Sequence, residues 1–285
     1  MPDFPIVDTH VHLYDVQRLR YGWMNDAPQL NRTSLPADFD AARGPVRVER
    51  MVFVEVAVDA GLHLAEAEFV QELADRDPRI GGMVAHLPVE RGEAIEPELI
   101  ALERHKALRG IRRLIQDERD PSMCVEPGFI AGVRLLGRHG LSFDICIRHW
   151  QMVYAIELVR RCPEVQFVLD HIGKPDIRRG LREPWWSQMR ALASLPNVAC
   201  KISGVATEAD HRNWTKDQLK PYVAHAIDCF GFDRAMFGSD WTVMELATRY
   251  PDWVALVDET IAGASAAEKR KLYRDNAIRI YRLPT

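Results

Sequence analysis

The sequence predicts one (β/α)₈ barrel that spans residues 1–285. Eight short apolar runs typical of buried strands recur along the chain, and helical stretches separate them. No shift in composition divides the chain, and its length suits a single barrel. The rival architecture is an open, doubly wound sheet, which would place a glycine-rich phosphate loop after the first strand. His10-Val11-His12 stands at that position, so the barrel is favoured.

The predicted strands are short and mostly apolar. They cover residues 5–12, 50–56, 80–86, 108–114, 141–147, 165–171, 197–203 and 234–240. A long polar and aromatic loop follows the first strand. Because it begins so close to a pair of histidines, we expect it to cover a site.

Helices are predicted between the strands from apolar residues at helical spacing, as with Ala65, Phe69 and Leu73. They cover residues 65–75, 96–105, 128–138, 151–161, 185–194 and 217–230. The sequence Ser-Ala-Ala-Glu at 265–268 has the form of a capping box. We expect this box to open a last helix that closes the bottom or side of the barrel.

The composition is that of an ordinary globular protein, with 47% hydrophobic and 27% charged residues and a net charge of −4. No acidic or basic block is present, so we expect a small-molecule partner and neither nucleic acid nor a membrane; a homo-oligomer is possible. The N-terminal residues have no signal-peptide pattern, and no apolar run approaches the length of a membrane span. The five cysteines are scattered without a C-x-x-C motif, which indicates free thiols in a reducing cytoplasm.

The first strand carries the strongest sign of a functional site. Because side chains alternate along a strand, His10 and His12 point to the same face. Two such imidazoles can form a bidentate site for zinc or another divalent transition metal, although a pair of structural histidines would look the same.

Other strand ends supply further candidates, because the site of a barrel lies at the carboxyl ends of its strands. The candidates are polar or aromatic, and nearly every strand end has one: Glu55, His86, Arg112, Arg113, Arg148, His149, His171, Lys174, Lys201, Ser203, Asp240 and Trp241. Asp170 and His171 should face opposite sides of their strand, and we expect His171 to point inward because it completes a set with His10 and His12. Asp144 lies inside an apolar run and is expected to form a structural hydrogen bond.

Five segments taken together resemble the amidohydrolase superfamily, in its branch of sugar-acid and dicarboxylic-acid lactonases. They are IVDTHVH at 6–12, LRGIR at 108–112, VLDHIGKP at 168–175, CKISG at 200–204 and FGSDW at 237–241. The resemblance runs from about Val7 to Tyr281. It implies that His10 and His12 are the metal pair of strand 1, that His171 is the strand 6 histidine, and that Asp240 is the strand 8 acid.

The chain also departs from the family pattern. Strand 4 carries Arg112 and Arg113 where two-metal members use a lysine that becomes a carbamate. We therefore expect at most one divalent metal, zinc being favoured, and metal-free catalysis remains open because some lactonases of this branch need no metal. His86 stands where relatives place tryptophan, and Glu55 is either a metal ligand or a partner for a substrate hydroxyl.

The resemblance implies a lactone hydrolase that acts on a sugar-acid lactone such as L-fuconolactone or L-rhamnonolactone. Asp240 would take the proton of the attacking water, and His171 would bind metal or hydrogen-bond the developing oxyanion. Cationic donors for substrate hydroxyls or a carboxylate are Arg112, Arg113, Lys174 and Lys201. We expect four tryptophans either to form an apolar wall for a sugar ring or to pack in the core: Trp23, Trp150, Trp185 and Trp241.

Two functions other than lactone hydrolysis would use the same residues. The first is a metal-dependent non-oxidative decarboxylase on the same scaffold, and the second is a non-catalytic metal- or ligand-binding protein. The polar stretch from Arg109 to Asp120 and the D-H-x-G-K-P motif favour the lactonase.

Overall fold

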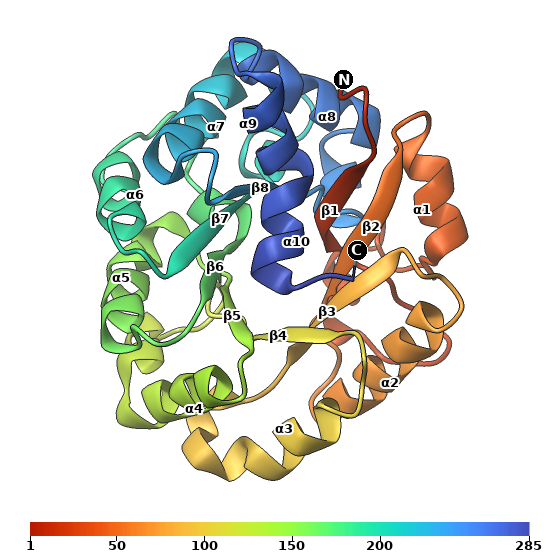
Figure 1. The fold of residues 1–285 in the computed structure, drawn as a ribbon, viewed down its shortest axis with the longest axis vertical. Coiled ribbons are helices and arrows are strands. Elements are labelled where there is room, and N and C mark those ends of the chain that lie inside the picture. Colours follow the sequence, from red (N-terminus) through yellow and green to blue (C-terminus); the bar gives the residue numbers. More distant parts are fainter. Residues whose placement is uncertain (285) are drawn as a thin grey trace.

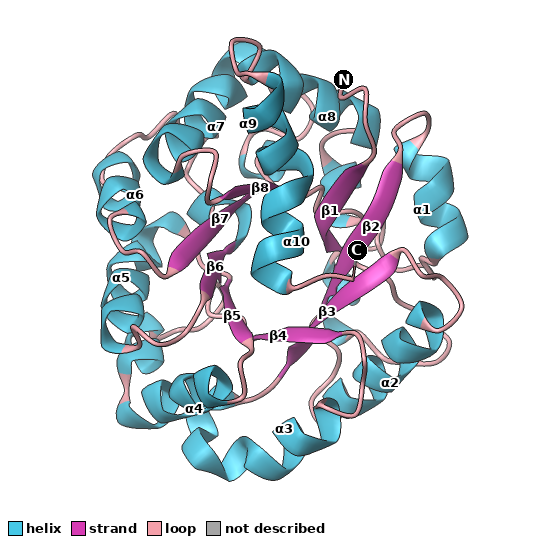
Figure 2. Cartoon of the chain, viewed as in Figure 1, coloured by secondary structure: helices cyan, strands magenta, loops and turns pink. Residues whose placement is uncertain are grey.

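The computed structural model describes residues 1–284 and confirms the predicted barrel. Eight parallel strands pair in the order β1 to β8, with helices around them (Figures 1 and 2). The strands are β1 Ile6–Val11, β2 Val48–Val54, β3 Ile80–His86, β4 Leu108–Arg112, β5 Ser142–Ile145, β6 Phe167–Leu169, β7 Val198–Ile202 and β8 Ala235–Phe237.

The barrel closes where the chain that leaves β8 meets β1. Val11 pairs in parallel with Trp241. The His12 amide donates to the carbonyl of Trp241 over 2.6 Å, and the Asp240 amide donates to the carbonyl of His10 over 2.9 Å. These two hydrogen bonds fix the backbone of Asp240 beside the two histidines of β1.

The helices pack outside the strands, apart from the last one. They are α1 Pro36–Arg43, α2 His63–Ala74, α3 Glu96–Leu102, α4 Pro127–Arg138, α5 Met152–Arg161, α6 Trp185–Ala193, α7 Lys216–Phe230, α8 Tyr250–Thr260, α9 Ala266–Arg270 and α10 Asn276–Tyr281. None of the helices within residues 1–284 is long and apolar enough to cross a membrane.

The chain after α8 closes one end of the barrel, as expected from the sequence. Ser265 caps α9, and its hydroxyl and the side chain of Glu268 form the predicted capping box. A π-helical turn then leads into α10, which lies over the open end of the ring of strands in Figure 1. Tyr281 and Leu283 pack there against the small apolar core inside the barrel, which includes Val7.

Three differences from the sequence prediction concern element boundaries. The loop expected after β1 contains α1, which begins at a proline and therefore at a residue preorganised for the first helical turn. The helix α8 was not predicted. Strands β1, β2, β6 and β8 end before His12, Glu55, His171 and Asp240, which were predicted inside them. Asp240 lies in the loop after β8 with a positive φ of 67°.

Candidate active site

A cavity of about 230 Å³ opens at the carboxyl ends of the strands. His12, His171 and Asp240 line it, together with Arg112 and Lys174. These five residues come from the ends of β1, β4, β6 and β8. The mouth of the barrel is therefore the place where the predicted candidates meet.

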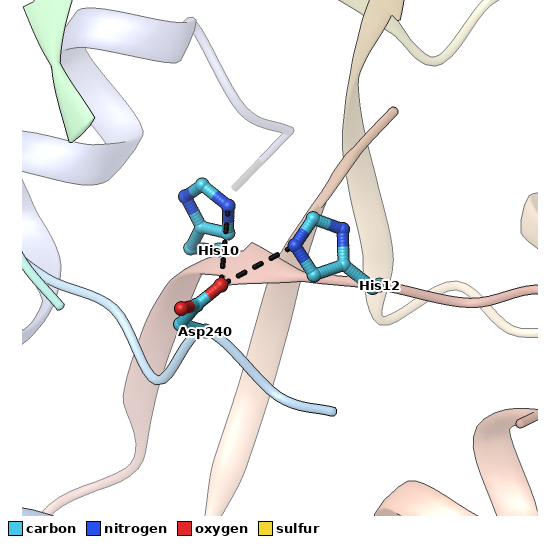
Figure 3. Close-up of side chains that lie close together, drawn as sticks. All are labelled: His10, His12 and Asp240. Carbon is cyan, nitrogen blue, oxygen red and sulfur yellow. Dashed lines mark ion pairs between the residues drawn. The ribbon is translucent and has the colours of Figure 1, made fainter. Parts of the chain in front are cut away.

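His10, His12 and Asp240 converge on one point (Figure 3). Asp240 Oδ1 lies 3.3 Å from His12 Nε2 and 3.7 Å from His10 Nε2. His10 lies in β1 and His12 directly follows it, with its amide still paired to the carbonyl of Trp241, and the hydrogen bonds that close the barrel bring the carboxylate to the two imidazoles. The three potential ligand atoms lie within 4.8 Å of one another.

The other ring nitrogens of the two histidines are already engaged. His12 Nδ1 lies 2.9 Å from the carbonyl oxygen of Val54, which can only accept, so Nδ1 carries the proton and donates. His10 Nδ1 lies 3.3 Å from Asp170 Oδ1. Burial lowers the pKa of His10 well below its ordinary value, so its ring is neutral. The Nε2 atoms of both rings therefore face Asp240 Oδ1, and Arg112 Nη1 also lies 3.4 Å from His10 Nε2. Two imidazoles and a carboxylate are a donor set that fits one divalent ion such as zinc.

His171 reaches the same cavity from a strained turn. After β6 the backbone enters the left-handed region, with φ of 53° at His171 and 48° at Lys174. The imidazole then lies with its Nδ1 3.0 Å from Ser203 Oγ and 3.8 Å from Asp240 Oδ2. Gly204 leaves room for this pair, since a Cβ there would lie 2.5 Å from His171 Nδ1.

This turn makes one sequence prediction wrong. Asp170 and His171 were expected to face opposite ways, yet both side chains point inward and both lie near His10. Alternation applies only within the strand, and β6 ends at Leu169. The inward Asp170 adds a buried carboxylate that the sequence analysis had placed outside the site.

Asp170 is held by two buried cations. Its Oδ1 lies 3.0 Å from the Lys201 ammonium, and its Oδ2 accepts from Arg112 Nη1 over 3.1 Å. Burial raises the pKa of Asp170, but Lys201, His10 and Arg112 outweigh it, so the pKa lies well below its ordinary value. His10, Asp170 and His171 also have the spacing of a metal site, but Lys201 and Arg112 already supply the positive charge there.

Arg112 and Lys201 also form hydrogen bonds with two other buried acidic residues. Arg112 Nε donates to Glu55 Oε1 over 2.7 Å, and its Nη2 donates to the Glu55 carbonyl over 2.6 Å. Lys201 donates to Asp144 Oδ2 over 2.7 Å, and the Tyr281 hydroxyl donates to the same oxygen over 2.7 Å. Asp144 therefore has the structural hydrogen bonds that its position in the sequence indicated.

The remaining sequence candidates lie at different depths. Trp23 lines the cavity, and its indole nitrogen donates to the carbonyl of Val56. Within residues 1–284 the cavity lining does not include His10, Arg148, His149 or Ser203. It also leaves out five further candidates: Glu55, His86, Arg113, Lys201 and Trp241.

Those five have other partners. The ring of His86 packs against His63. Arg113 forms ion pairs with Glu90 and Glu118. Trp241 packs against Phe39 and donates to Glu245. Glu55 and Lys201 belong to the buried ion network beneath the cavity. Of the other tryptophans, Trp150 is exposed and Trp185 is buried.

Sequence reasoning missed several residues that line the cavity. Tyr14 comes from the loop after β1, and its hydroxyl lies 2.9 Å from Thr242 Oγ1. Gln116 accepts from Lys174 Nζ over 2.5 Å and from the thiol of Cys146 over 3.4 Å. The sequence indicated these residues only through two long polar segments, the loop after β1 and the stretch from Arg109 to Asp120. Length and polarity do not identify which single residues of a segment line a cavity.

The chain is similar to known proteins over almost its whole length. A family model described as amidohydrolase matches residues 7–283. The chain is 32% identical to an L-fucono-1,5-lactonase of Burkholderia multivorans, over 98% of this chain and 96% of that enzyme. It is 28% identical to an L-fucono-1,5-lactonase of Burkholderia ambifaria, over 97% of this chain and 95% of that enzyme. A crystal structure of a Burkholderia multivorans amidohydrolase with bound zinc superposes with a TM-score of 0.88 at 31% identity, over 99% of this chain and 100% of that chain.

The buried position of Lys201 leads to a prediction about stability. Lys201→Met should lower the free energy of unfolding by about 3–5 kcal/mol, because it leaves Asp144 and Asp170 buried without their shared cation. Urea unfolding of the variant and the parent measures the change. Lys174→Met is the matched control and should cost far less, since Lys174 has one hydrogen-bond acceptor and lines a cavity. Equal stabilities for the Lys201 variant and the parent would contradict the prediction.

Proposed function

The chain belongs to the amidohydrolase family of enzymes, and from this premise we propose that it hydrolyses a sugar-acid lactone of the L-fucono-1,5-lactone type to the aldonic acid. One observation carries the proposal. A buried carboxylate, Asp240, meets three histidines at the cavity in the mouth of the barrel. The lactonase names of relatives that match almost the whole chain support the same reaction.

Opening a lactone requires a base for water and a donor for the carbonyl oxygen on which negative charge develops. Burial raises the pKa of Asp240, but His171, His12 and Lys174 more than offset it, so the pKa lies below its ordinary value. Asp240 is therefore ionised at neutral pH. It accepts the proton of the attacking water and returns it to the leaving alkoxide.

The two oxygens of Asp240 face different neighbours. Oδ1 faces the Nε2 atoms of His10 and His12, and Oδ2 faces His171. We assign Oδ2 to the water proton and Oδ1 to the histidine pair. Lys174 lines the cavity, and its ammonium group is the cationic donor that we assign to the developing oxyanion.

One divalent ion, with zinc the best match, would be held by His10, His12 and Asp240. When bound, the ion would polarise the lactone carbonyl and lower the pKa of a water. The proton transfer by Asp240 and the hydrogen-bond donors of Lys174 do not depend on that ion, so metal-free turnover is compatible with the same residues.

The cavity also suits a small polyhydroxylated ring. Its volume of about 230 Å³ accommodates one monocyclic sugar lactone. Tyr14, Trp23, Gln116 and Thr242 give it one aromatic wall and several hydrogen-bonding groups. All five cysteines are free thiols, which supports the proposed cytoplasmic location.

The reaction type can be tested with a panel of six-carbon and 6-deoxy aldonolactones. We expect hydrolysis with release of one proton per lactone and no carbon dioxide, because water attacks an ester and no carbon–carbon bond breaks. A pH indicator and a carbon dioxide sensor follow the two products on the same sample. Carbon dioxide release from an aromatic or unsaturated acid, without turnover of any lactone, would replace the proposal by the decarboxylase alternative.

The role of Asp240 can be tested with Asp240→Asn. Asparagine keeps the size and tolerates the positive φ of this position, so the fold should survive. The amide cannot accept the water proton, so kcat should fall by about 10²–10⁴-fold while KM changes little. Steady-state kinetics and a melting curve on one preparation separate catalysis from folding. A folded variant with near-normal turnover would remove Asp240 from the mechanism.

A further inference from the structure

We propose that two residues outside the cavity position the general base Asp240. Asp8 of β1 holds the loop that carries Asp240 against the first strand, and Tyr250 of α8 holds the carboxylate of Asp8 from outside the barrel. This inference rests on the proposed function, because it concerns the residue to which we assign the proton of the attacking water. It gives a role to the acid of the IVDTHVH segment, which the proposed mechanism leaves unused.

The seam between β8 and β1 is held differently from the rest of the barrel. Each of the other seven neighbouring pairs of strands forms a parallel ladder of paired residues. Within residues 1–284, β8 and β1 form no such ladder, and the isolated bridge between Val11 and Trp241 lies beyond the end of β8. The backbone of the loop after β8 therefore depends on side-chain partners at this seam.

Asp8 supplies such a partner from the β1 side of the seam, and its side chain is fully buried. Oδ1 accepts from the His10 amide over 3.0 Å and from the Ser239 amide over 2.9 Å, so one oxygen joins the backbones of β1 and of the loop after β8. Oδ2 accepts from the Tyr250 hydroxyl over 2.9 Å. The same carboxylate thus links β1, the loop after β8 and α8.

Ser239 transmits this constraint to Asp240, its neighbour in the sequence. The Ser239 hydroxyl donates to the carbonyl of His10 over 3.2 Å and accepts from the amide of Trp241 over 2.9 Å. Asp240 has a φ of 67°, in the left-handed region, where a residue other than glycine is strained and persists only when its surroundings fix it. The hydrogen bonds before and after Asp240 therefore hold this conformation, in which its carboxylate faces the histidines.

The first turn of α8 supports the same loop from the other side. Tyr250 and Trp253 lie three residues apart and therefore on one face of the helix. The Trp253 indole donates to the carbonyl of Gly238 over 2.9 Å, and the Tyr250 hydroxyl donates to Asp8. Gly238 permits this close packing, because a Cβ there would lie 3.1 Å from the Cβ of His10.

The cavity lining described within residues 1–284 contains neither Asp8 nor Tyr250. Both act through the position of Asp240, and they are therefore positioning residues. Loss of their hydrogen bonds should lower kcat more than it changes KM. The reason is that a small displacement of the base slows the chemical step, whereas the rest of the cavity still binds the lactone.

Tyr250→Phe is the mildest test, because it removes one hydroxyl and keeps the ring that packs against Phe39 and Phe237. With the most active lactone of the panel, it should lower kcat by about 10-fold and change KM by less than about twofold. The matched control is Tyr273→Phe. Tyr273 is also buried and packs against Phe237, but its hydroxyl donates to the carbonyl of Val254 within α8. The control should leave kcat within about twofold of the parent.

Substitution of Asp8 tests the carboxylate itself. Asp8→Ala should lower kcat by about 10–100-fold, again with little change in KM. Asp8→Asn should recover most of that loss, because its amide oxygen can accept from both backbone amides. Melting curves on the same preparations, with kinetics measured well below each transition, keep unfolding out of the kcat values.

An Asp240→Asn background separates positioning from a general effect on folding. There, Tyr250→Phe should lower the residual kcat by less than about twofold, because the carboxylate to be positioned is absent. An equal loss of kcat in both backgrounds would overturn the inference, and so would a Tyr250→Phe enzyme with the kcat of the parent. Either result leaves the lactonase function intact. A parent enzyme that opens no lactone of the panel contradicts the proposed function itself, and the inference with it.

Discussion

The candidate site depends on the ion pairs that hold Asp170 between Lys201 and Arg112. Both side-chain oxygens of this buried carboxylate face cations, at 3.0 Å and 3.1 Å. Removing either cation would leave a charge unpaired in the barrel interior, which is far more costly than losing a surface ion pair. The network also orients His10, because Asp170 lies 3.3 Å from His10 Nδ1. The Nε2 of that ring is thereby directed toward Asp240.

The same network sets the charge of the site. Arg112 and Lys201 lie where a second divalent ion would otherwise share His10, Asp170 and His171. Two fixed cations in a low-dielectric interior strongly disfavour another cation beside them. We propose that an ion, when bound, takes the position between His10, His12 and Asp240, although Arg112 Nη1 also lies 3.4 Å from His10 Nε2. The two cations are in turn anchored by Glu55 and Asp144, and Asp144 accepts a hydrogen bond from Tyr281 in the closing helix α10.

The sequence was a good guide to the fold and to the residues at strand ends, for physical reasons. Short apolar runs identified all eight strands, and alternation along the predicted first strand placed His10 and His12 together. It failed at Asp170, because a left-handed turn after Leu169 replaces the alternation of a strand. The sequence also contains no measure of how deep a side chain lies. Lys201 in β7 is buried beneath the cavity and Lys174 after β6 lines it, although both were predicted as candidates at strand ends. Loop residues such as Gln116 carry no periodic signal, so only the tertiary structure places them.

The number of metal ions per chain tests this account most directly. The protein would be incubated with excess zinc, dialysed, and its zinc measured by elemental analysis against protein concentration. The account predicts at most one ion per chain, because Arg112 and Lys201 occupy the neighbouring position. Two tightly bound zinc ions per chain would contradict it, and so would a carboxylated lysine in the site.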